Sequence, residues 1–190
     1  MFKTLSCKIT GVAPLIQHNG QLADARNPFA KEMKKLSGKR NKTDADLEEL
    51  ARFEWHGSLY LTDGRPCLPG ELLEAHLIEA AKKRKQGPQA RAGLYCDGTF
   101  PLLYDGPTAL DDLWEDERFR LTTGARVQRN RVMRTRPIFQ EWALAFEVIY
   151  NSSMLNPDDI CQFLRIGGEQ IGLGDWRPRF GRYTVDETTV

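Results

Sequence analysis

The sequence has few of the residues that build metal sites and disulfide frameworks. Its 190 residues include four cysteines and three histidines, and no two cysteines lie within a few residues of each other. Zinc sites and small disulfide-bonded domains need closely spaced cysteines. We therefore expect no metal site, no cofactor and no disulfide. Buried or half-buried thiols are expected at Cys7, Cys67, Cys96 and Cys161.

Long apolar runs are also missing. No stretch approaches the roughly 20 consecutive apolar residues that a membrane-spanning helix requires. Met1 leads directly into the alternating pattern of Leu5, Cys7 and Ile9, with no apolar signal segment before it. These absences predict a soluble, cytoplasmic protein with no membrane partner. The chain is long enough for one domain with a sizeable core.

The net charge is close to zero, but the charges are segregated along the chain. The formal net charge is +1, from 27 basic and 26 acidic residues. Most of the basic residues lie in four segments that together contain one acid, Glu32; these segments are 31–42, 82–91, 126–136 and 177–182. Such segments either neutralise the phosphates of a nucleic acid or form ordinary solvated faces. For 82–85 both interpretations are equally favoured, because lysines in the last turn of a helix also stabilise its dipole.

Hydrophobic patterning predicts an α+β fold. Strands are expected where apolar residues alternate, and helices where they recur every three or four positions. The strong elements, in order, are a strand at 3–11, a helix at 70–85, a strand near 94–104 with a hairpin signal at Asp97-Gly98, a strand at 142–150, a helix at 157–171 and a strand at 180–186. This βαββαβ order is that of the ferredoxin-like (RRM-like) fold, in a single domain over 1–190.

Two insertions accompany this core. The first is an arm at about 17–56, in which 17–42 are polar and basic with little periodicity, and Thr43 to about Trp55 are predicted to be helical. We expect little regular structure in 17–42, and we expect residues 19–42 to be mobile in the isolated protein and to become ordered against RNA or a neighbouring subunit. A short strand at 58–62 is predicted to turn at Asp63-Gly64. The second insertion covers about 105–136, with an acidic helix predicted at 107–119.

An arginine run ends the second insertion. It contains no acid, and its alternation changes between Arg131 and Arg134, so it does not form one face of one regular strand. A loop that follows RNA accommodates this pattern, and a solvated run is the alternative. The arginines that we expect to contact RNA here are Arg126, Arg129, Arg131, Arg134 and Arg136.

Glycines, arginines and aromatic rings concentrate between the helix predicted at 157–171 and the last strand. Glycine permits positive φ and close approach to a ligand, whereas arginines and aromatic rings bind phosphates and unstacked bases. Trp176 would either stack on a base or pack under the loop. This glycine-rich loop predicts an RNA site, in which the arginines bind phosphates and the loop amides form a nest against the RNA backbone. The alternative is that these are surface arginines paired with nearby acids. The residues of the predicted site are Gly172, Gly174, Trp176, Arg177, Arg179, Gly181 and Arg182.

With this loop, GLGDWRPRFGRYTV, the sequence resembles the RAMP superfamily of CRISPR proteins. Two further matches are the helix start at Leu68-Pro69-Gly70 and the first strand, which continues through Gly11-Val12-Ala13-Pro14-Leu15 to His18. The resemblance thus consists of three short motifs spread over the whole chain. It implies a ferredoxin-like RNA-binding protein. Within the superfamily, the chain is most similar to the backbone subunits of effector complexes.

The resemblance implies a non-catalytic, guide-RNA-binding subunit that assembles along the RNA. Its expected partners are guide RNA, copies of itself and other effector-complex subunits, with target nucleic acid as a further candidate. His18 and Asn19 are expected among the RNA contacts. Two alternatives stay open: an endoribonuclease of the same superfamily that uses His18 or Asp24, and a stand-alone single-stranded nucleic-acid-binding protein. We expect no cleavage, because no second histidine or tyrosine is paired with His18 in the sequence to complete an acid–base pair.

Overall fold

The protein has a mixed α+β fold built on antiparallel sheets. The structure is a computed structural model and describes residues 1–127 and 130–189. The larger sheet has the strand order β10-β1-β9-β6-β4-β3, and β5 also pairs with β9. Its strands are β1 (Phe2–Gly11), β3 (Leu61–Thr62), β4 (Arg65–Pro69), β5 (Leu94–Tyr95), β6 (Thr99–Leu103), β9 (Ala143–Asn151) and β10 (Tyr183–Thr189). The predicted α+β class is therefore confirmed.

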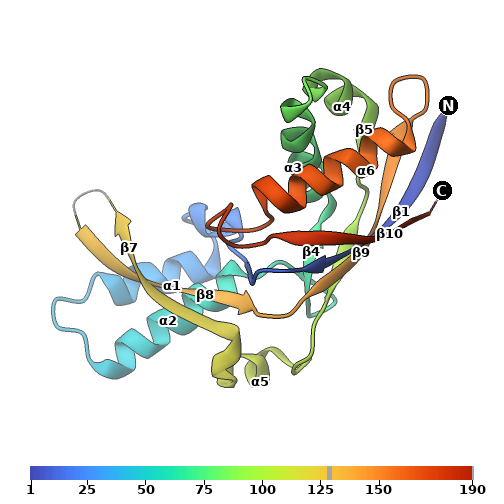
Figure 1. Cartoon of the computed structure of the whole chain (residues 1–190). Helices are drawn as coiled ribbons and strands as arrows, with labels where there is room; N and C mark the ends of the chain where they lie inside the picture. Colours follow the sequence, from blue (N-terminus) through green and yellow to red (C-terminus); the bar gives the residue numbers. More distant parts are fainter. Residues whose placement is uncertain (128–129, 190) are drawn as a thin grey trace.

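Helices α3 (Gly70–Lys83) and α6 (Pro157–Ile166) lie along one face of this sheet, and α4 (Gly87–Gly93) follows α3 (Figure 1). The alternating residues of β1 that were predicted to face the core are buried against these helices, since Leu5, Cys7 and Ile9 are each at most 3 % exposed. Leu77 of α3 and Phe163 of α6 belong to the same core. The four cysteines are free thiols, buried or half-buried as predicted.

The predicted hairpin at Asp97-Gly98 is wrong. Strand β5 pairs with one end of β9 and β6 with the other, both antiparallel, so the two segments run in the same direction along one neighbour. Asp97 and Gly98 interrupt the strand and do not reverse the chain. An Asp-Gly pair indicates a position with positive φ, and the φ of Gly98 is 94°. Such a glycine occurs at irregularities within a strand as well as in hairpin turns.

The first part of the arm is helical, which corrects the expectation of irregular structure. Helix α1 (Pro28–Ser37) follows a short 3-10 helix, η1 (Gly20–Ala23). The side chain of Asn27 accepts hydrogen bonds from the N–H groups of Phe29 and Ala30, and Pro28 occupies the first helical position. Asn-Pro is thus a helix start that periodicity alone misses. Helix α1 packs against α2 (Asp44–Ser58), where the Phe29 ring stacks on His56 with centroids 6.5 Å apart.

The rest of the arm agrees more closely with the sequence. Helix α2 begins after Thr43, whose side chain accepts a hydrogen bond from the N–H of Asp46, and it ends at Ser58, beyond the predicted end. The strand predicted at 58–62 is therefore shorter and starts at Leu61. As predicted, it turns into β4 at Asp63 and Gly64, which have φ of 49° and 74°.

The described arginines of the run lie on the two paired strands of a β-hairpin and not in a loop; they are Arg126, Arg131, Arg134 and Arg136. Strand β7 (Arg120–Val127) pairs with β8 (Asn130–Phe139), and β8 also pairs with β2 (Leu15–Ile16) in a second, three-stranded sheet. Arg126 is opposite Arg131 in the register, so the run crosses from one strand to the other. The hairpin extends away from the larger sheet (Figure 1). Residues two apart in a strand share a face, so Arg134 and Arg136 lie on one face of β8, and that face meets α2.

The acidic helix predicted at 107–119 is split in two. Helix α5 (Leu110–Glu115) is followed by a 3-10 helix, η2 (Glu117–Phe119), which leads into β7. The ring of Trp114 lies against Trp55 of α2 with centroids 5.6 Å apart, and the Trp55 indole N–H donates to the Phe119 carbonyl at 2.9 Å. These contacts attach the second insertion to the arm. Within the described part of the chain, no helix is long and apolar enough to cross a membrane.

Candidate nucleic-acid interface

The glycine-rich loop, residues 172–182, follows α6 and its π-helical extension η3 (Gly167–Ile171), and it leads into β10. Gly172, Gly174 and Gly181 have φ of 78°, 76° and 72°. Only glycine adopts this region at little cost. A Cβ atom at any of the three positions would also collide with a backbone carbonyl oxygen. The course of the loop therefore requires glycine at all three.

Hydrogen bonds pin the loop to the segment between β1 and the arm. The Asp175 N–H donates to the Ile16 carbonyl, and the Gly181 N–H to the Pro14 carbonyl, both at 2.8 Å. Gly172 also donates within the protein, to the carbonyl of Gly167, and Gly172 and Gly181 are buried. The prediction that loop amides bind phosphates is therefore wrong for Gly172 and Gly181, whose N–H groups donate within the protein. The two glycines shape the loop, and contacts with a ligand are left to its other amides and to the side chains that it carries.

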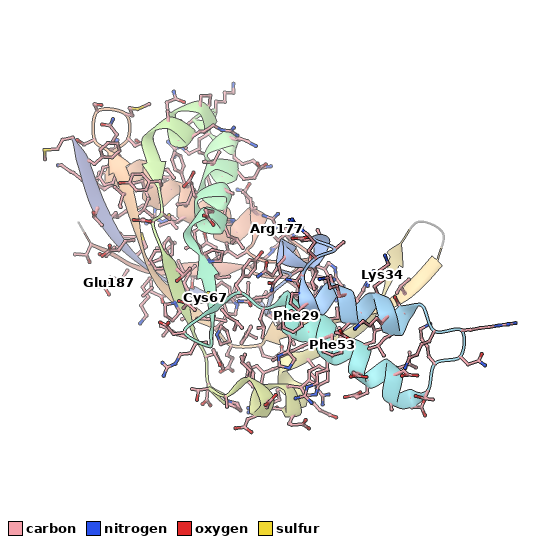
Figure 2. All side chains as sticks on the ribbon, turned by 180° about the vertical axis from the view of Figure 1, so that it is seen from behind. Phe29, Lys34, Phe53, Cys67, Arg177 and Glu187 are labelled. Carbon is pink, nitrogen blue, oxygen red and sulfur yellow. The ribbon has the colours of Figure 1, made fainter. Side chains whose placement is uncertain are left out.

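Three arginine side chains of the loop are exposed: Arg177, Arg179 and Arg182. In the described residues, none of their guanidinium groups lies within 4.0 Å of a carboxylate. Arg182 instead donates from Nε to the Pro178 carbonyl at 2.7 Å. Figure 2 shows Arg177 between the core and the arm. Pairing with nearby acids, the alternative interpretation of these arginines, is therefore not what the structure shows.

Trp176 packs within the loop. Its φ is 55°, its ring is half-buried, and the ring centroid lies 6.1 Å from that of Phe180. The Trp176 N–H donates to Oδ1 of Asp175 at 3.0 Å. Of the two fates weighed for this tryptophan, the structure shows packing, and stacking on a base stays a prediction for the exposed part of the ring.

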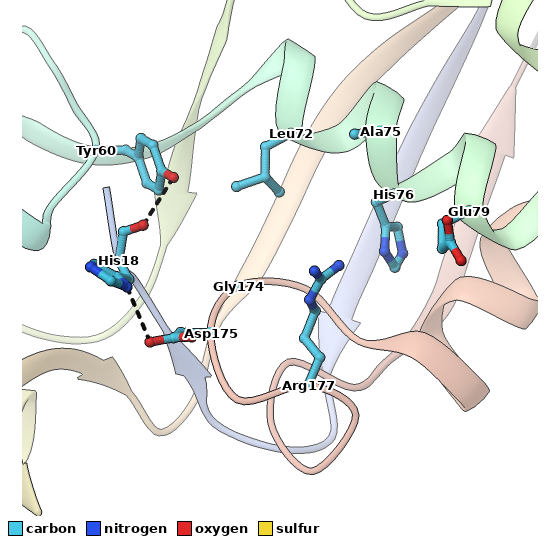
Figure 3. Close-up of a pocket in the computed structure, with 9 residues that line it drawn as sticks. All are labelled: His18, Tyr60, Leu72, Ala75, His76, Glu79, Gly174, Asp175 and Arg177. Carbon is cyan, nitrogen blue, oxygen red and sulfur yellow. Dashed lines mark hydrogen bonds and ion pairs between the residues drawn. The ribbon is translucent and has the colours of Figure 1, made fainter. Parts of the chain in front are cut away.

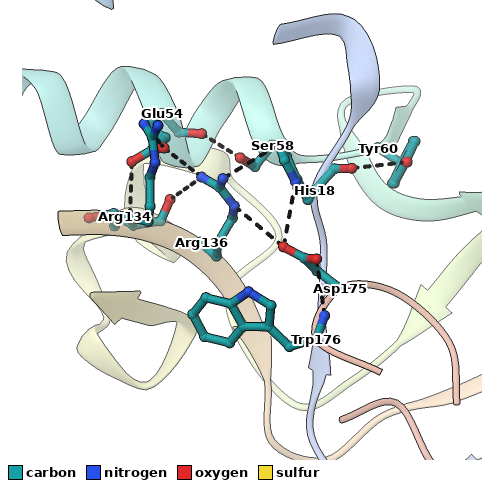
Figure 4. A network of polar contacts seen from close by, with 9 residues as sticks. His18, Glu54, Ser58, Tyr60, Arg134, Arg136, Asp175 and Trp176 are labelled. Atoms are coloured by element: carbon teal, nitrogen blue, oxygen red, sulfur yellow. Dashed lines mark hydrogen bonds and ion pairs between the residues drawn. The ribbon is translucent and has the colours of Figure 1, made fainter. Parts of the chain in front are cut away.

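A network of charged side chains lies beneath the loop (Figure 4). Nη1 of Arg136, in β8, lies 2.7 Å from Oε1 of Glu54, in α2, and the two side chains are 8 % and 5 % exposed. Arg134 contacts the same carboxylate oxygen at 3.1 Å. On its other side, Nε of Arg136 lies 3.8 Å from Oδ2 of Asp175 in the glycine-rich loop. The network therefore joins the hairpin, the arm and the loop.

The expectation that Arg134 and Arg136 contact RNA needs correction. Arg136 faces inward, where Glu54 balances its charge, and Arg134 is half-buried beside it. Glu54 precedes Arg134 by 80 positions in the sequence, and helix α2 places it against the hairpin. A local sequence pattern does not reveal a pair so far apart. The other three arginines of the run keep their RNA contact as a prediction: Arg126 and Arg131 are opposite each other toward the end of the hairpin, and Arg129 lies outside the described residues.

His18 and Asn19 follow β2, close to this network. Nδ1 of His18 lies 3.5 Å from Oδ2 of Asp175, and its Nε2 lies 3.4 Å from Nη2 of Arg136. The His18 side chain is 42 % exposed, so part of its ring is open to a ligand. The Asn19 side chain donates to the Leu59 carbonyl at 3.0 Å and accepts a hydrogen bond from the backbone of η1. Asn19 therefore holds the start of the arm.

Asp175 is a functional candidate that the sequence interpretation missed. A hydrogen bond from His18 lowers the pKa of this carboxyl group, burial opposes that effect, and the Trp176 N–H and the charge of Arg136 add to it. Ionised Asp175 therefore lies between His18 and a buried arginine. A signal was available, because Asp175 is the single acid of the loop. An acid in a basic segment favours pairing with the cations around it.

A pocket of about 410 Å³ opens between α3 and the glycine-rich loop (Figure 3). Arg177 extends from the loop toward α3. His76, which is 3 % exposed, lies with its Nε2 2.8 Å from the Tyr183 hydroxyl. Burial and then the charge of Arg177 lower the pKa of His76 to about 4, so its ring is neutral at pH 7. The pocket is lined by His18, Tyr60, Leu72, Ala75, His76, Glu79, Gly174, Asp175 and Arg177.

Asp24, the other residue weighed for catalysis, is exposed before α1. Its carboxylate lies 3.2 Å from Nε of Arg26, and hydrogen bonds from the backbone and then the side chain of Arg26 lower the pKa of Asp24. In the part of the chain that the structure describes, no three histidine, cysteine, aspartate or glutamate side chains gather as they would to hold a metal ion. Asp24 thus has an arginine as its charged neighbour.

Comparisons with known proteins do not assign the chain to a family. No protein-family model matches it, and no curated protein matches it. Its function is therefore inferred from the residues of the loop, the pocket and the hairpin.

Proposed function

We propose that this chain is a guide-RNA-binding backbone subunit of a CRISPR effector complex, with a ferredoxin-like core of the RAMP type. It assembles along the guide RNA with copies of itself and with other effector subunits in the cytoplasm. The strand order β10-β1-β9-β6, with α3 and α6 on one face, supports this proposal because it follows the βαββαβ order of that core. Fold alone carries no function, so the proposal depends on the loop.

The observation that carries the proposal is the set of exposed arginines on the pinned glycine-rich loop. Arg177, Arg179 and Arg182 have no carboxylate partner among the described residues, and the hydrogen bonds of the loop fix its backbone beneath them. When the backbone that carries the cations is already fixed, phosphate binding loses little conformational entropy. Phosphate contacts position a nucleic acid without reading its bases. Such a site suits a guide RNA whose sequence varies.

The hairpin β7–β8 is the second surface of the proposal. It extends from the larger sheet on the same side of the molecule as the arm (Figure 1). Arg126 and Arg131 are opposite each other near its end, and Arg136 at its base is connected to the loop through Asp175. The network thus fixes the base of the hairpin relative to the loop. RNA that crosses the loop would reach the outer arginines of the hairpin or of a neighbouring copy.

The site favours binding over cleavage. Metal-independent RNA cleavage needs a base to deprotonate the 2′-hydroxyl and an acid for the leaving oxygen. In His18 one ring nitrogen faces the Asp175 carboxylate and the other faces the guanidinium of Arg136. Both ring nitrogens of His18 therefore face charged side chains of the protein itself. This arrangement supports a role for His18 in positioning the loop.

The test is RNA binding by the double variant Arg177→Ala/Arg179→Ala at several salt concentrations. Each lost phosphate contact lowers the slope of log K against log salt by about 0.7 for a single strand, so the double variant should lower it by about 1.4 for unrelated sequences alike. The matched control is Lys31→Ala/Lys34→Ala on α1, which removes the same charge from exposed positions. A folded Arg177→Ala/Arg179→Ala variant with the affinity and slope of the wild-type protein would refute the loop as the RNA site.

A second candidate is the endoribonuclease. The observation that favours it is the pocket, which brings Tyr60 and His76 beside His18 although the three are far apart in the sequence. Metal-free cleavage of repeat RNA that is lost in His18→Ala and in Tyr60→Phe would establish this alternative. Nucleic acid that copurifies with the protein separates the remaining readings: RNA of uniform length indicates a guide complex, and heterogeneous strands indicate a stand-alone binder.

A further inference from the structure

The basic segment 82–85 continues the α3 side of the pocket. Residues three and four positions apart lie on one face of an α-helix. Four residues of α3 line the pocket, and the same face continues to Lys82 and Lys83 at the end of the helix. At 1.5 Å per residue, this stripe is about 16 Å long. The pocket-lining residues are Leu72, Ala75, His76 and Glu79.

The far end of this stripe is positively charged. Nζ of Lys82 lies 2.6 Å from Oε2 of Glu79, so these two charges offset each other. Lys83, Arg84 and Lys85 are exposed, and none of them lies within 4.0 Å of a carboxylate in the described residues. The helix dipole accounts for cations in the last turn only. Arg84 already caps the helix, and Lys85 lies beyond it with φ of 61°.

Arg177 supplies positive charge at the near end of the stripe. The hydrogen bond and charge of Lys82, followed by the charges of Lys83 and Arg177, lower the pKa of Glu79. Cations from the loop and from the end of α3 therefore act on one carboxylate between them. The pocket between them carries both signs, because Asp175 also lines it and Glu71 is exposed at the start of α3. The cations without a carboxylate partner in the described residues lie at its two ends, on Arg177 and on Lys83, Arg84 and Lys85.

We propose that α3 carries the continuation of the RNA path. Single-stranded RNA bound by Arg177 at the loop passes over the pocket and places further phosphates on Lys83, Arg84 and Lys85. This inference rests on the proposed function and adds to it the direction in which the RNA leaves the loop. Exposed cations spaced along a groove track a single-stranded backbone, and the pocket beneath gives one unstacked base room to turn inward.

The test is the triple variant Lys83→Gln/Arg84→Gln/Lys85→Asn. Asparagine is chosen at position 85 because it tolerates the positive φ of Lys85. Binding of an arbitrary single-stranded RNA of guide length is measured from low to moderate salt. Three lost phosphate contacts should lower the slope of log K against log salt by about 2. The matched control, Lys31→Gln/Lys34→Gln/Arg40→Gln, removes three exposed cations from the arm and should lower the slope by less than half as much.

A triple variant with the slope of the wild-type protein, or with the slope of its control, would overturn the α3 path. Failure of the proposed function looks different, because Arg177→Ala/Arg179→Ala would then leave RNA binding unchanged. Circular dichroism and the unfolding midpoint establish that each variant is folded. If the triple variant unfolds, Lys83→Gln alone is expected to lower the slope by about 0.7, and no change in this single variant would refute the path.

Discussion

Replacing Glu54 with glutamine should strongly destabilise the protein. The Glu54 carboxylate is 5 % exposed and accepts contacts from Arg136 at 2.7 Å, Arg134 at 3.1 Å and the Thr135 N–H at 2.9 Å. Glutamine keeps the shape and one acceptor oxygen but removes the charge. Arg136 is then left buried, with Asp175 at 3.8 Å as its remaining counterion. Removing one partner of a buried ion pair costs about 3–5 kcal/mol.

For a chain of this size, 1 kcal/mol shifts the unfolding midpoint by about 2–4 °C, so Glu54→Gln should lower it by at least about 6 °C. Urea unfolding gives the free energy directly. The control is Asp111→Asn, which breaks the exposed pair with Arg52 at 2.7 Å and should cost at most about 1 kcal/mol. The double variant Glu54→Gln/Arg136→Met removes both buried charges and should regain part of the lost stability.

The reasoning would be refuted if Glu54→Gln cost no more than Asp111→Asn. It would also be refuted if the effects of the two substitutions simply added. In that case the double variant would lose the free energy that Glu54→Gln loses plus the full free energy that Arg136→Met loses alone. That result would show that the two residues act independently. RNA binding by the variants gives a separate readout. Because the Arg136 side chain connects the hairpin to the loop, its loss should weaken RNA binding even where the protein remains folded.

Two further predictions concern buried parts of the site. The pKa of His76 is about 4 in the folded protein and 6.5 ordinarily, so the neutral ring stabilises the fold above pH 6.5. This stabilisation is lost as the pH falls toward 4, by about 3 kcal/mol in total. Urea unfolding across this pH range should show a smaller loss in His76→Gln than in the wild-type protein. Gly181→Ala should lower the free energy of unfolding clearly more than Gly64→Ala. Both glycines have positive φ, but only at Gly181 would a Cβ atom collide with the backbone of Leu173. Equal losses of unfolding free energy would contradict this prediction.

Local patterns predicted the core well. The alternation in β1 and the three- and four-residue recurrences in α3 and α6 report which side of each element is buried, so the elements were placed in the correct order. Start signals were less complete. Thr43 was recognised as a helix start, but Asn27-Pro28 was not, since the helix that follows is polar and basic and its apolar face is small. Helix α1 was therefore missed.

Contacts between distant segments could not be predicted in this way. The arginine run gave no sign that Glu54 pairs with Arg134 and Arg136, because the partners are in different insertions and meet only when α2 packs against β8. For the same reason, the pocket was not anticipated, as Tyr60 and His76 come to His18 from separate elements. The glycine-rich loop is easier to recognise because its glycines and arginines are contiguous in the sequence, and the structure places positive φ at Gly172, Gly174 and Gly181 and exposes its arginines. Its contacts with His18 and Arg136 come from distant segments and were not predicted.

The antiparallel pairing of β1 with β10 places the C-terminal strand beside the N-terminal strand. Ser6 is opposite Thr189, while Gly11, at the other end of β1, is opposite Tyr183, where the glycine-rich loop ends (Figure 1). At about 3.3 Å per residue, the ten residues of β1 place Phe2 about 30 Å from Gly11, and the seven residues of β10 place Thr189 about 20 Å from Tyr183, where the loop ends. A purification tag or surface attachment at either end thus leaves the loop accessible.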